Sequence, residues 1–285
     1  GDEVVTSPFS FFATVSAIVR LGATPVFADV DDETLLLDPG AVERVVGPRT
    51  KAILPVHLFG RIAPMRELVA IARRASAALV EDAAQAFGGH VGEAASPSDE
   101  RRAAGTIGDL GCFSFFPTKT LGALGDGGLV VTHDAALAAR IRTLRSHGAS
   151  PKYHHAAVGG NFRLDALQAA FLRAKLPHLP GWIAARRAVA ALYVDELARS
   201  GALAVPGVRL LAPDVEGHAA AQLTLRVPRR DAVRAALLAA GIATEVYYPE
   251  PLHLQPALAR LGARVGDLPK AERAARDVLS LPFGP

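Results

Sequence analysis

The first half of the chain alternates short apolar strand patterns with helical patterns, and this rhythm limits the possible folds most. Strand patterns cover residues 25–30, 51–56 and 77–82, and helical patterns cover residues 11–21 and 65–75. The strand patterns are apolar along most of their length, which is typical of strands in a sheet that is covered on both faces. The sequence therefore predicts an α/β fold with a mostly parallel sheet sandwiched by helices.

The second half follows a different pattern. A strong helical pattern covers residues 162–175, and we expect Pro177 and Pro180 to end it before a long helix begins at Trp182. We place a domain boundary here, with a large domain over residues 1–180 and a smaller C-terminal α/β domain over residues 181–285. The smaller domain has strand patterns at 208–211, 222–227 and 243–247, and helical patterns at 231–240, 255–261 and 268–279.

Composition excludes several classes of protein. Half of the residues are hydrophobic and the formal net charge is +3, so the chain can form a sizeable core. Its arginine doublets are dispersed along the sequence, which argues against a nucleic-acid surface. No apolar run approaches the roughly 20 residues that span a bilayer. The single cysteine, Cys112, cannot form a disulfide within the chain, so we expect a reducing, cytoplasmic location. No metal site is predicted.

Three polar residues stand at the ends of predicted strands. Asp82 ends an apolar run, Ser114 lies within the next one, and Lys119 follows in a Pro-Thr loop. Ligands of parallel sheets bind beyond the carboxyl ends of the strands. An amine, a carboxylate and a hydroxyl brought together there match pyridoxal phosphate (PLP), whose aldehyde, ring nitrogen and phosphate need these partners. Taken singly, Asp82 could be a helix cap, Ser114 a core hydroxyl and Lys119 a surface lysine.

Lysine is scarce in this chain, which narrows the choice of amine. Five of the 31 basic Lys and Arg residues are lysines, and of these Lys119 alone sits in a Gly/Pro/Thr loop directly after a buried strand. A lysine must lose its proton to attack an aldehyde, and desolvation at such a position lowers its pKa.

Eight sequence blocks, in order, resemble the DegT/StrS family of PLP-dependent nucleotide-sugar aminotransferases, which have fold type I. The resemblance extends over nearly the whole chain. The blocks are Gly1-Asp2-Glu3-Val4-Val5, Pro8-Phe9-Ser10-Phe11-Phe12-Ala13-Thr14, Pro55-Val56-His57-Leu58-Phe59-Gly60, Glu81-Asp82-Ala83-Ala84-Gln85, Gly111-Cys112-Phe113-Ser114-Phe115-Phe116-Pro117-Thr118-Lys119, Gly125-Asp126-Gly127-Gly128, Gly160-Asn161-Phe162-Arg163-Leu164-Asp165 and Tyr248-Pro249-Glu250-Pro251-Leu252-His253.

The resemblance implies a role for each matching residue. Lys119 is expected to hold PLP as a Schiff base and to move the substrate proton, and Asp82 to pair with the pyridinium nitrogen. Gln85 would bond the ring hydroxyl and Ser114 the phosphate. The remaining cofactor contacts would be Phe11 and Ala84 on the two ring faces, and Asn161, which reaches the partner's phosphate in a homodimer with shared sites. Positions near the sugar would be Arg163, Tyr247, Tyr248 and His253.

The activity implied is a ping-pong transfer of an amino group from L-glutamate to a keto group on a nucleotide-diphosphate sugar. Sugar dehydratases of the same fold carry histidine in place of the lysine, so Lys119 argues against them. Two alternatives remain: an aminotransferase that acts on a keto-cyclitol, and a PLP-binding regulator without turnover. A nicotinamide enzyme would need a Gly-x-Gly-x-x-Gly turn after the first strand, where this chain has Thr6-Ser7-Pro8-Phe9.

Two features of the sequence differ from the family pattern and bear on the expected site. The family carries further residues before the position of Gly1, including a Gly-Thr turn that binds the phosphate. The loop over residues 88–105 is longer than the family pattern, and we expect either a lid or a variable surface loop there.

Overall fold

A six-stranded sheet forms the centre of the computed structural model, which describes residues 1–91, 102–211 and 217–284. The strand order is β2-β1-β3-β4-β7-β8. All neighbouring pairs are parallel except β7 and β8, which are antiparallel. This confirms the mostly parallel α/β sheet. The strands are β1 (Glu3–Thr6), β2 (Thr24–Phe27), β3 (Thr50–Leu54), β4 (Ala78–Asp82), β7 (Leu110–Ser114) and β8 (Gly128–Val131).

Helices cover both faces of this sheet. On one face, α2 (Pro39–Val45) and α3 (Met65–Ala75) pack their apolar side chains against Val5, Ile53 and Leu79 of the three central strands. Side chains alternate along β4, so Asp82 points to the opposite face from Leu79. On that face it meets α1 (Phe12–Arg20). The sheet therefore presents the end of β4 to the first turn of α1.

A second, antiparallel sheet lies in the C-terminal part, in the order β11-β10-β9. It contains β9 (Arg209–Leu210), β10 (Leu223–Arg226) and β11 (Val278–Leu281), with α7 (Arg230–Ala239) and α8 (Pro269–Asp277) beside it. This unit is tied to the first half of the chain. The carboxylate of Asp29 accepts the N–H groups of Lys270 and Ala271 in the first turn of α8, both at 3.0 Å. The division of the chain at residue 180 stays a prediction.

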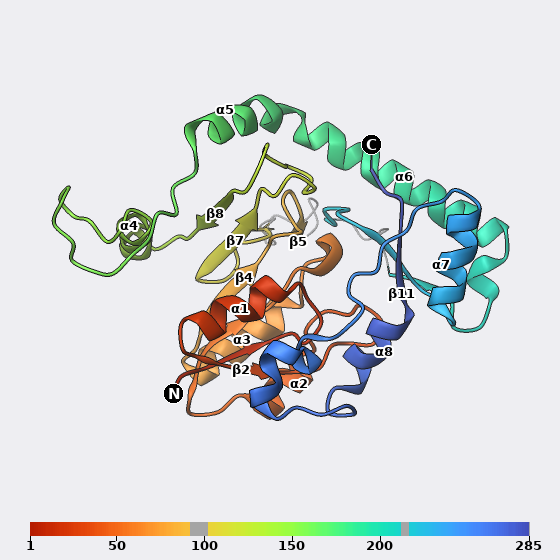
Figure 1. Ribbon diagram of the computed structural model, residues 1–285, viewed down its shortest axis with the longest axis horizontal. Helices are drawn as coiled ribbons and strands as arrows, with labels where there is room; N and C mark the ends of the chain where they lie inside the picture. The colour runs from red at the N-terminus through yellow and green to blue at the C-terminus, as the bar shows by residue number, and fades with distance from the viewer. Residues whose placement is uncertain (92–101, 212–216, 285) are drawn as a thin grey trace, which may run out of the picture.

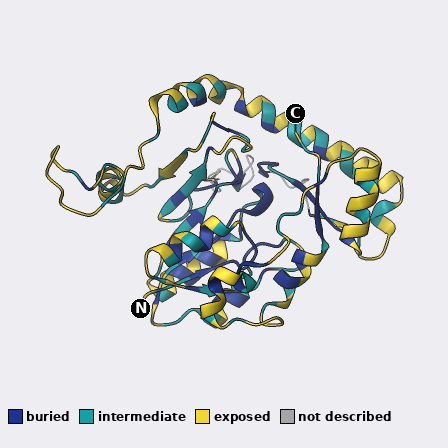
Figure 2. Cartoon of the chain, viewed as in Figure 1, coloured by how far each residue is buried: buried dark blue, intermediate teal, exposed yellow. Residues whose placement is uncertain are grey.

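The predicted interruption of the helical region near Pro177 is confirmed. Helix α5 (Ala166–Lys175) ends where expected, and the 3-10 turn η2 (Leu176–His178) separates it from α6 (Leu179–Arg199), which begins three residues before the expected start at Trp182. Both prolines occupy first-turn positions, where a missing N–H and a fixed φ cost little. These helices form an arch across the top of the view, and α4 (Ala135–Leu144) lies at the far left, beyond β8 (Figure 1). These helices are largely exposed (Figure 2).

Three C-terminal elements differ from expectation. Residues 243–247 form a single bridge between Glu245 and Ser280 instead of a strand. The helix expected over 255–261 is a 3-10 helix, η5 (Pro256–Leu261), which follows η4 (Leu252–Leu254). Helix α8 stops at Asp277, and the apolar residues after it pair with β10 as β11. Among the described residues, no helix is long and apolar enough to cross a membrane.

The remaining short elements are two strands and two 3-10 helices. Strands β5 (His90–Val91) and β6 (Arg102–Ala103) form an antiparallel pair, and the 3-10 helices η1 (Leu58–Gly60) and η3 (Ala202–Ala204) complete the set. Most of the 88–105 loop, for which we expect a lid or a variable surface, lies outside the described residues.

Candidate active site

Asp82 is held at the end of β4 by two hydrogen bonds. Its Oδ2 accepts the hydroxyl of Thr14 at 2.7 Å, and its Oδ1 accepts the backbone N–H of Ala84 at 3.1 Å. Each carboxylate oxygen can accept two hydrogen bonds, so both retain a free lone pair. Asp82 can therefore receive a further cationic or N–H donor.

The adjacent carboxylate, Glu81, is fully buried and fully engaged. It accepts His57 Nε2 at 2.8 Å and the N–H groups of Gly105, Ile107 and Gly108. Burial by itself raises the pKa of Glu81, but the hydrogen bond and charge of His57 and the Gly108 and Gly105 N–H groups hold it below its ordinary value. Glu81 thus fixes the segment that leads into β7.

Lys119 follows β7 in a tight turn, in which its N–H donates to the carbonyl of Phe116 at 2.8 Å. Burial lowers the pKa of the Lys119 amine, and the negative charge of Asp82 raises it in part, with a net lowering. The amine and the carboxylate are therefore close enough to interact. A lowered pKa increases the fraction of neutral, nucleophilic amine near neutral pH.

Ser114 ends β7 and faces the same pocket as Lys119. Its Oγ accepts the N–H of Phe116 at 3.2 Å, which leaves the hydroxyl proton available to an anionic ligand. The pocket brings together four of the predicted site residues: Ala84, Gln85, Ser114 and Lys119. The other lining residues are Phe87, Thr118, Thr120, Ala221 and Gln222.

Gln85 links this pocket to the C-terminal part. Its Oε1 accepts the N–H of Phe59 at 2.6 Å and its Nε2 donates to the hydroxyl of Tyr248 at 3.1 Å. One N–H of the amide remains available for a ligand. The Tyr248 ring lies 6.3 Å from the ring of Phe11, which is 61% exposed. Tyr248 is mostly buried, and burial raises the pKa of its hydroxyl, which stays protonated at neutral pH.

The other predicted residues do not line this pocket. Asp82 and Phe11 lie next to its lining: Asp82 accepts the N–H of Ala84, and the Phe11 ring packs near Tyr248, which bonds Gln85. His253 is buried, with its Nε2 3.1 Å from Glu272 and its ring beside Phe27. Tyr247 packs edge-on against Tyr248. Asn161 and Arg163 are exposed, on the segment between α4 and α5. For these four residues, contact with a substrate or a partner stays a prediction.

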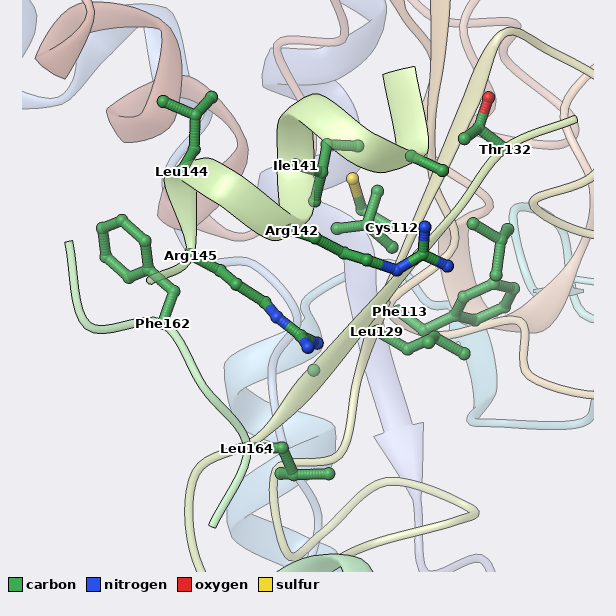
Figure 3. A pocket seen from close by; sticks show the side chains of 14 residues that line it. Cys112, Phe113, Leu129, Thr132, Ile141, Arg142, Leu144, Arg145, Phe162 and Leu164 are labelled. Carbon is green, nitrogen blue, oxygen red and sulfur yellow. The ribbon is translucent and has the colours of Figure 1, made fainter. Parts of the chain in front are cut away.

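A larger pocket lies between β8 and α4 (Figure 3). Phe162 and Leu164 line it together with Ile141, Arg142 and Arg145. Cys112 also faces it, but burial, with the charges of Asp82 and Glu81, raises the pKa of this thiol to about 11. The thiol is therefore protonated and weakly nucleophilic at neutral pH. The lining includes none of the residues predicted to contact cofactor or substrate.

Three residues in or beside the site were not predicted from the sequence. Thr14 belongs to a family-like block that implies no role for it, although it stands three residues after Phe11 and contacts Asp82. His57 likewise carries no implied role, and its ring holds Glu81. Gln222 falls in a strand pattern, yet its buried Oε1 has no partner among the described residues and its side chain lines the Lys119 pocket. No local pattern marks contacts between residues so far apart in sequence.

The donors and acceptors in and beside the pocket fit PLP. Lys119 offers an amine of lowered pKa, Ser114 a free hydroxyl proton and Gln85 a spare N–H within the pocket, and Asp82 offers free lone pairs beside it. Among the described residues, the buried Oε1 of Gln222 has no hydrogen-bond donor, so it can accept from a ligand. An amine and an anion-binding hydroxyl in one pocket, with a carboxylate next to it, suit chemistry at a carbonyl group.

Comparison with known proteins agrees with this geometry. A sequence model of the DegT/DnrJ/EryC1/StrS aminotransferase family matches residues 1–285. The chain is 47% identical over 287 residues to a pleiotropic regulatory protein of Geobacillus stearothermophilus, covering 100% of this chain and 74% of that protein. It is 43% identical to UDP-N-acetyl-3-dehydro-alpha-D-glucosamine 3-aminotransferase of Acidithiobacillus ferrooxidans, covering 100% of this chain and 73% of the relative.

Solved structures share the fold closely. DesV of Streptomyces venezuelae, determined in complex with a ketimine intermediate, superposes with a TM-score of 0.90 at 44% identity. The match covers 99% of this chain and 73% of DesV. With the family match along its full length, the chain belongs to the DegT/DnrJ/EryC1/StrS aminotransferase family, whose members have fold type I.

Proposed function

We propose that this protein is a PLP-dependent aminotransferase that moves an amino group from L-glutamate to a keto group of a nucleotide-diphosphate sugar. One observation carries the proposal: the Lys119 amine, its pKa lowered by burial, lies within the influence of the Asp82 carboxylate and shares a pocket with Ser114. The names of the relatives support the substrate class, since the Acidithiobacillus protein is a UDP-sugar 3-aminotransferase.

The cofactor assignment has further support from a related structure. NtdA of Bacillus subtilis, 29% identical with a TM-score of 0.89, was solved with bound PMP; the match covers 100% of this chain and 63% of NtdA. When bound, PLP supplies an electrophilic carbon for amines and an electron sink for the carbanion formed beside them. The protein's part is to bind, orient and move protons.

The residues divide this work. Lys119 would hold the cofactor through its amine nitrogen and, as a free amine, would carry the substrate proton. Asp82 keeps a proton on the ring nitrogen through its free lone pairs, and Gln85 donates its spare N–H to the ring hydroxyl. Ser114 donates to the phosphate, while Phe11 and Ala84 cover the two ring faces.

The substrate and partner roles extend the same proposal. Arg163, Tyr247, Tyr248 and His253 would contribute to the sugar site; of these, Tyr248 has direct support because its hydroxyl bonds Gln85. Asn161 is exposed, which suits a side chain that reaches a second subunit in a homodimer. A cytoplasmic location is part of the proposal.

The decisive experiment replaces Lys119 with alanine. Without an amine, the visible absorbance band of covalently bound PLP disappears and glutamate-dependent transfer falls by about a thousandfold or more. Lys51→Ala, which removes an exposed lysine, is the matched control and retains both signals. If the Lys119→Ala protein keeps a borohydride-reducible adduct at another lysine, the assignment of Lys119 is wrong.

Substrate screening separates the remaining alternatives. An aminotransferase of nucleotide sugars turns over keto-sugar nucleotides with glutamate, whereas a cyclitol enzyme prefers the free keto-cyclitol. A regulator without turnover would bind PLP yet convert neither acceptor.

A further inference from the structure

Two buried hydroxyls connect α1 to the carboxylate of Asp82. Thr14 Oγ1 lies 2.7 Å from Asp82 Oδ2, and Ser10 Oγ lies 3.0 Å from Thr14 Oγ1. Ser10 and Thr14 are 3% and 6% exposed, so water competes little for these bonds. The three residues form one chain of contacts that ends on the acid.

The donor in each of these two hydrogen bonds follows from the number of hydroxyl protons that are available. An ionised carboxylate can only accept, so the single hydroxyl proton of Thr14 points to Asp82. Thr14 then accepts the proton of Ser10 through its remaining lone pairs. The Thr14 bond is charge-assisted, and the Ser10 bond polarises it further.

Phe11 lies at the start of the first turn of α1, close in sequence to Thr14. Phe11 is the residue before α1, and its carbonyl accepts the N–H of Thr14 at 3.2 Å. This backbone hydrogen bond thus fixes the position of Phe11 relative to Thr14, whose hydroxyl donates to Asp82. The other Asp82 oxygen is fixed by the N–H of Ala84, two residues further along the chain.

We propose that Thr14 is a positioning residue for Asp82, oriented by Ser10, which holds the carboxylate in the rotamer that receives the cofactor ring nitrogen. This inference rests on the proposed function of Asp82 and extends it to two buried hydroxyls behind the carboxylate. Removing the Thr14 hydroxyl leaves the charge of Asp82 in place but removes one of the two hydrogen bonds that fix its side chain. The cofactor then loses orientation energy at its ring nitrogen, while the residues Ser114 and Lys119 themselves are unchanged.

The test uses Thr14→Val, which keeps the shape and deletes the hydroxyl. Apoprotein is titrated with PLP, and binding is followed by intrinsic fluorescence and by the visible absorbance band. Loss of one hydrogen bond to a charged group weakens PLP binding by about tenfold to a hundredfold. Thr14→Ser restores binding to near the wild-type level, and Ser10→Ala gives a smaller loss in the same direction.

The chain offers a matched control for general damage. Thr224 and Ser280 form a second buried hydroxyl pair, 2.8 Å apart, across β10 and β11. Thr224→Val removes the same group from an equally buried site. We expect it to lower thermal stability as much as Thr14→Val does and to leave PLP affinity within about twofold of wild type. Equal loss of PLP affinity in both proteins overturns the inference.

A double-mutant cycle tests whether Thr14 acts through Asp82. Asp82→Asn weakens PLP binding, and adding Thr14→Val in that background causes little further loss, because the charged acceptor is already gone. Additive losses contradict a positioning role. Failure of the proposed function can be told apart from failure of this inference. If the wild-type protein forms no lysine adduct with PLP, the cofactor assignment is wrong. If the wild-type protein binds PLP and Thr14→Val binds it equally well, only this inference is refuted.

Discussion

Glu81 and Asp82 are adjacent carboxylates with different surroundings, and this difference decides which one can serve a ligand. Alternation along β4 directs them to opposite faces of the sheet. Glu81 receives four hydrogen bonds from His57 and the 105–108 segment, so it has little capacity left. Asp82 receives two, both on positions that leave lone pairs free. Glu81 thus has a structural role, whereas Asp82 is free to bind a ligand.

His218 supports a prediction at this scale. Burial, followed by the charges of Arg61 and Arg187, lowers its pKa to about 4 from 6.5. Between these values the unfolded state binds more protons, so the stabilisation is fully present above pH 6.5 and is lost as pH falls toward 4. The loss amounts to about 3 kcal/mol of unfolding free energy.

Urea unfolding at pH 7 and pH 4.5 measures this effect. His218→Asn keeps an acceptor for the Ala220 N–H, which His218 Nδ1 binds at 2.8 Å, but cannot titrate. Between the two pH values, the unfolding free energy of the wild-type protein should therefore fall by about 2 kcal/mol more than that of His218→Asn. Identical pH dependence in the two proteins would show that His218 is not the titrating group.

At the scale of elements, β7 depends on a close backbone contact. A Cβ on Gly111 would lie 2.0 Å from the carbonyl oxygen of Gly105, in the segment that Glu81 holds. Neither side can move freely, because β7 is hydrogen-bonded to β4 and β8. The glycine therefore permits the approach that places Ser114 and Lys119 at the pocket.

Gly111→Ala should destabilise the protein by about 3 kcal/mol or more, since the added methyl must displace backbone atoms. It should also weaken PLP binding by moving the end of β7. Gly47→Ala, with no atom within 4 Å of its Cβ, is the control. Chemical denaturation and PLP titration measure both effects; unchanged stability in Gly111→Ala would refute the close contact.

Elements with strong local patterns can be predicted, and those shaped by distant contacts cannot. The helix expected over 65–75 forms as α3, because its apolar spacing matches one helical face. The strand expected at 243–247 fails because its apolar residues pack on the Phe9 cluster without a continuous ladder. Lys119 and Asp82 can be proposed as site residues from sequence blocks, and those roles stay predictions. The part of Thr14 cannot be proposed in this way, because its contact spans 68 residues.

At the scale of the whole molecule, large apolar side chains are exposed just before α1, on the segment between α4 and α5, and on α5 itself. Phe11 is 61% exposed, Phe162 is 71% exposed and Leu167 is 80% exposed. Apolar exposure of this kind suits a surface that another chain covers. It supports the proposed homodimer, in which Asn161 completes a neighbouring site.

Subunit mixing tests this arrangement. Lys119→Ala and Asn161→Ala subunits, each inactive alone, form heterodimers with one complete site. Random reassociation of equal amounts should recover about a quarter of wild-type activity, since half of the dimers are mixed and each has one working site. Two batches of Lys119→Ala mixed together give the background. No recovery in verified heterodimers would exclude a site shared through Asn161.

The carboxylate of Asp29 completes the first turn of α8 from 241 and 242 residues away. Helix ends need such acceptors, and here the acceptor comes from the segment that follows β2. The first turn of α8 can therefore be completed only after two segments far apart in the sequence have come together. Contacts of this long range slow folding, because the intervening chain must be ordered before they form.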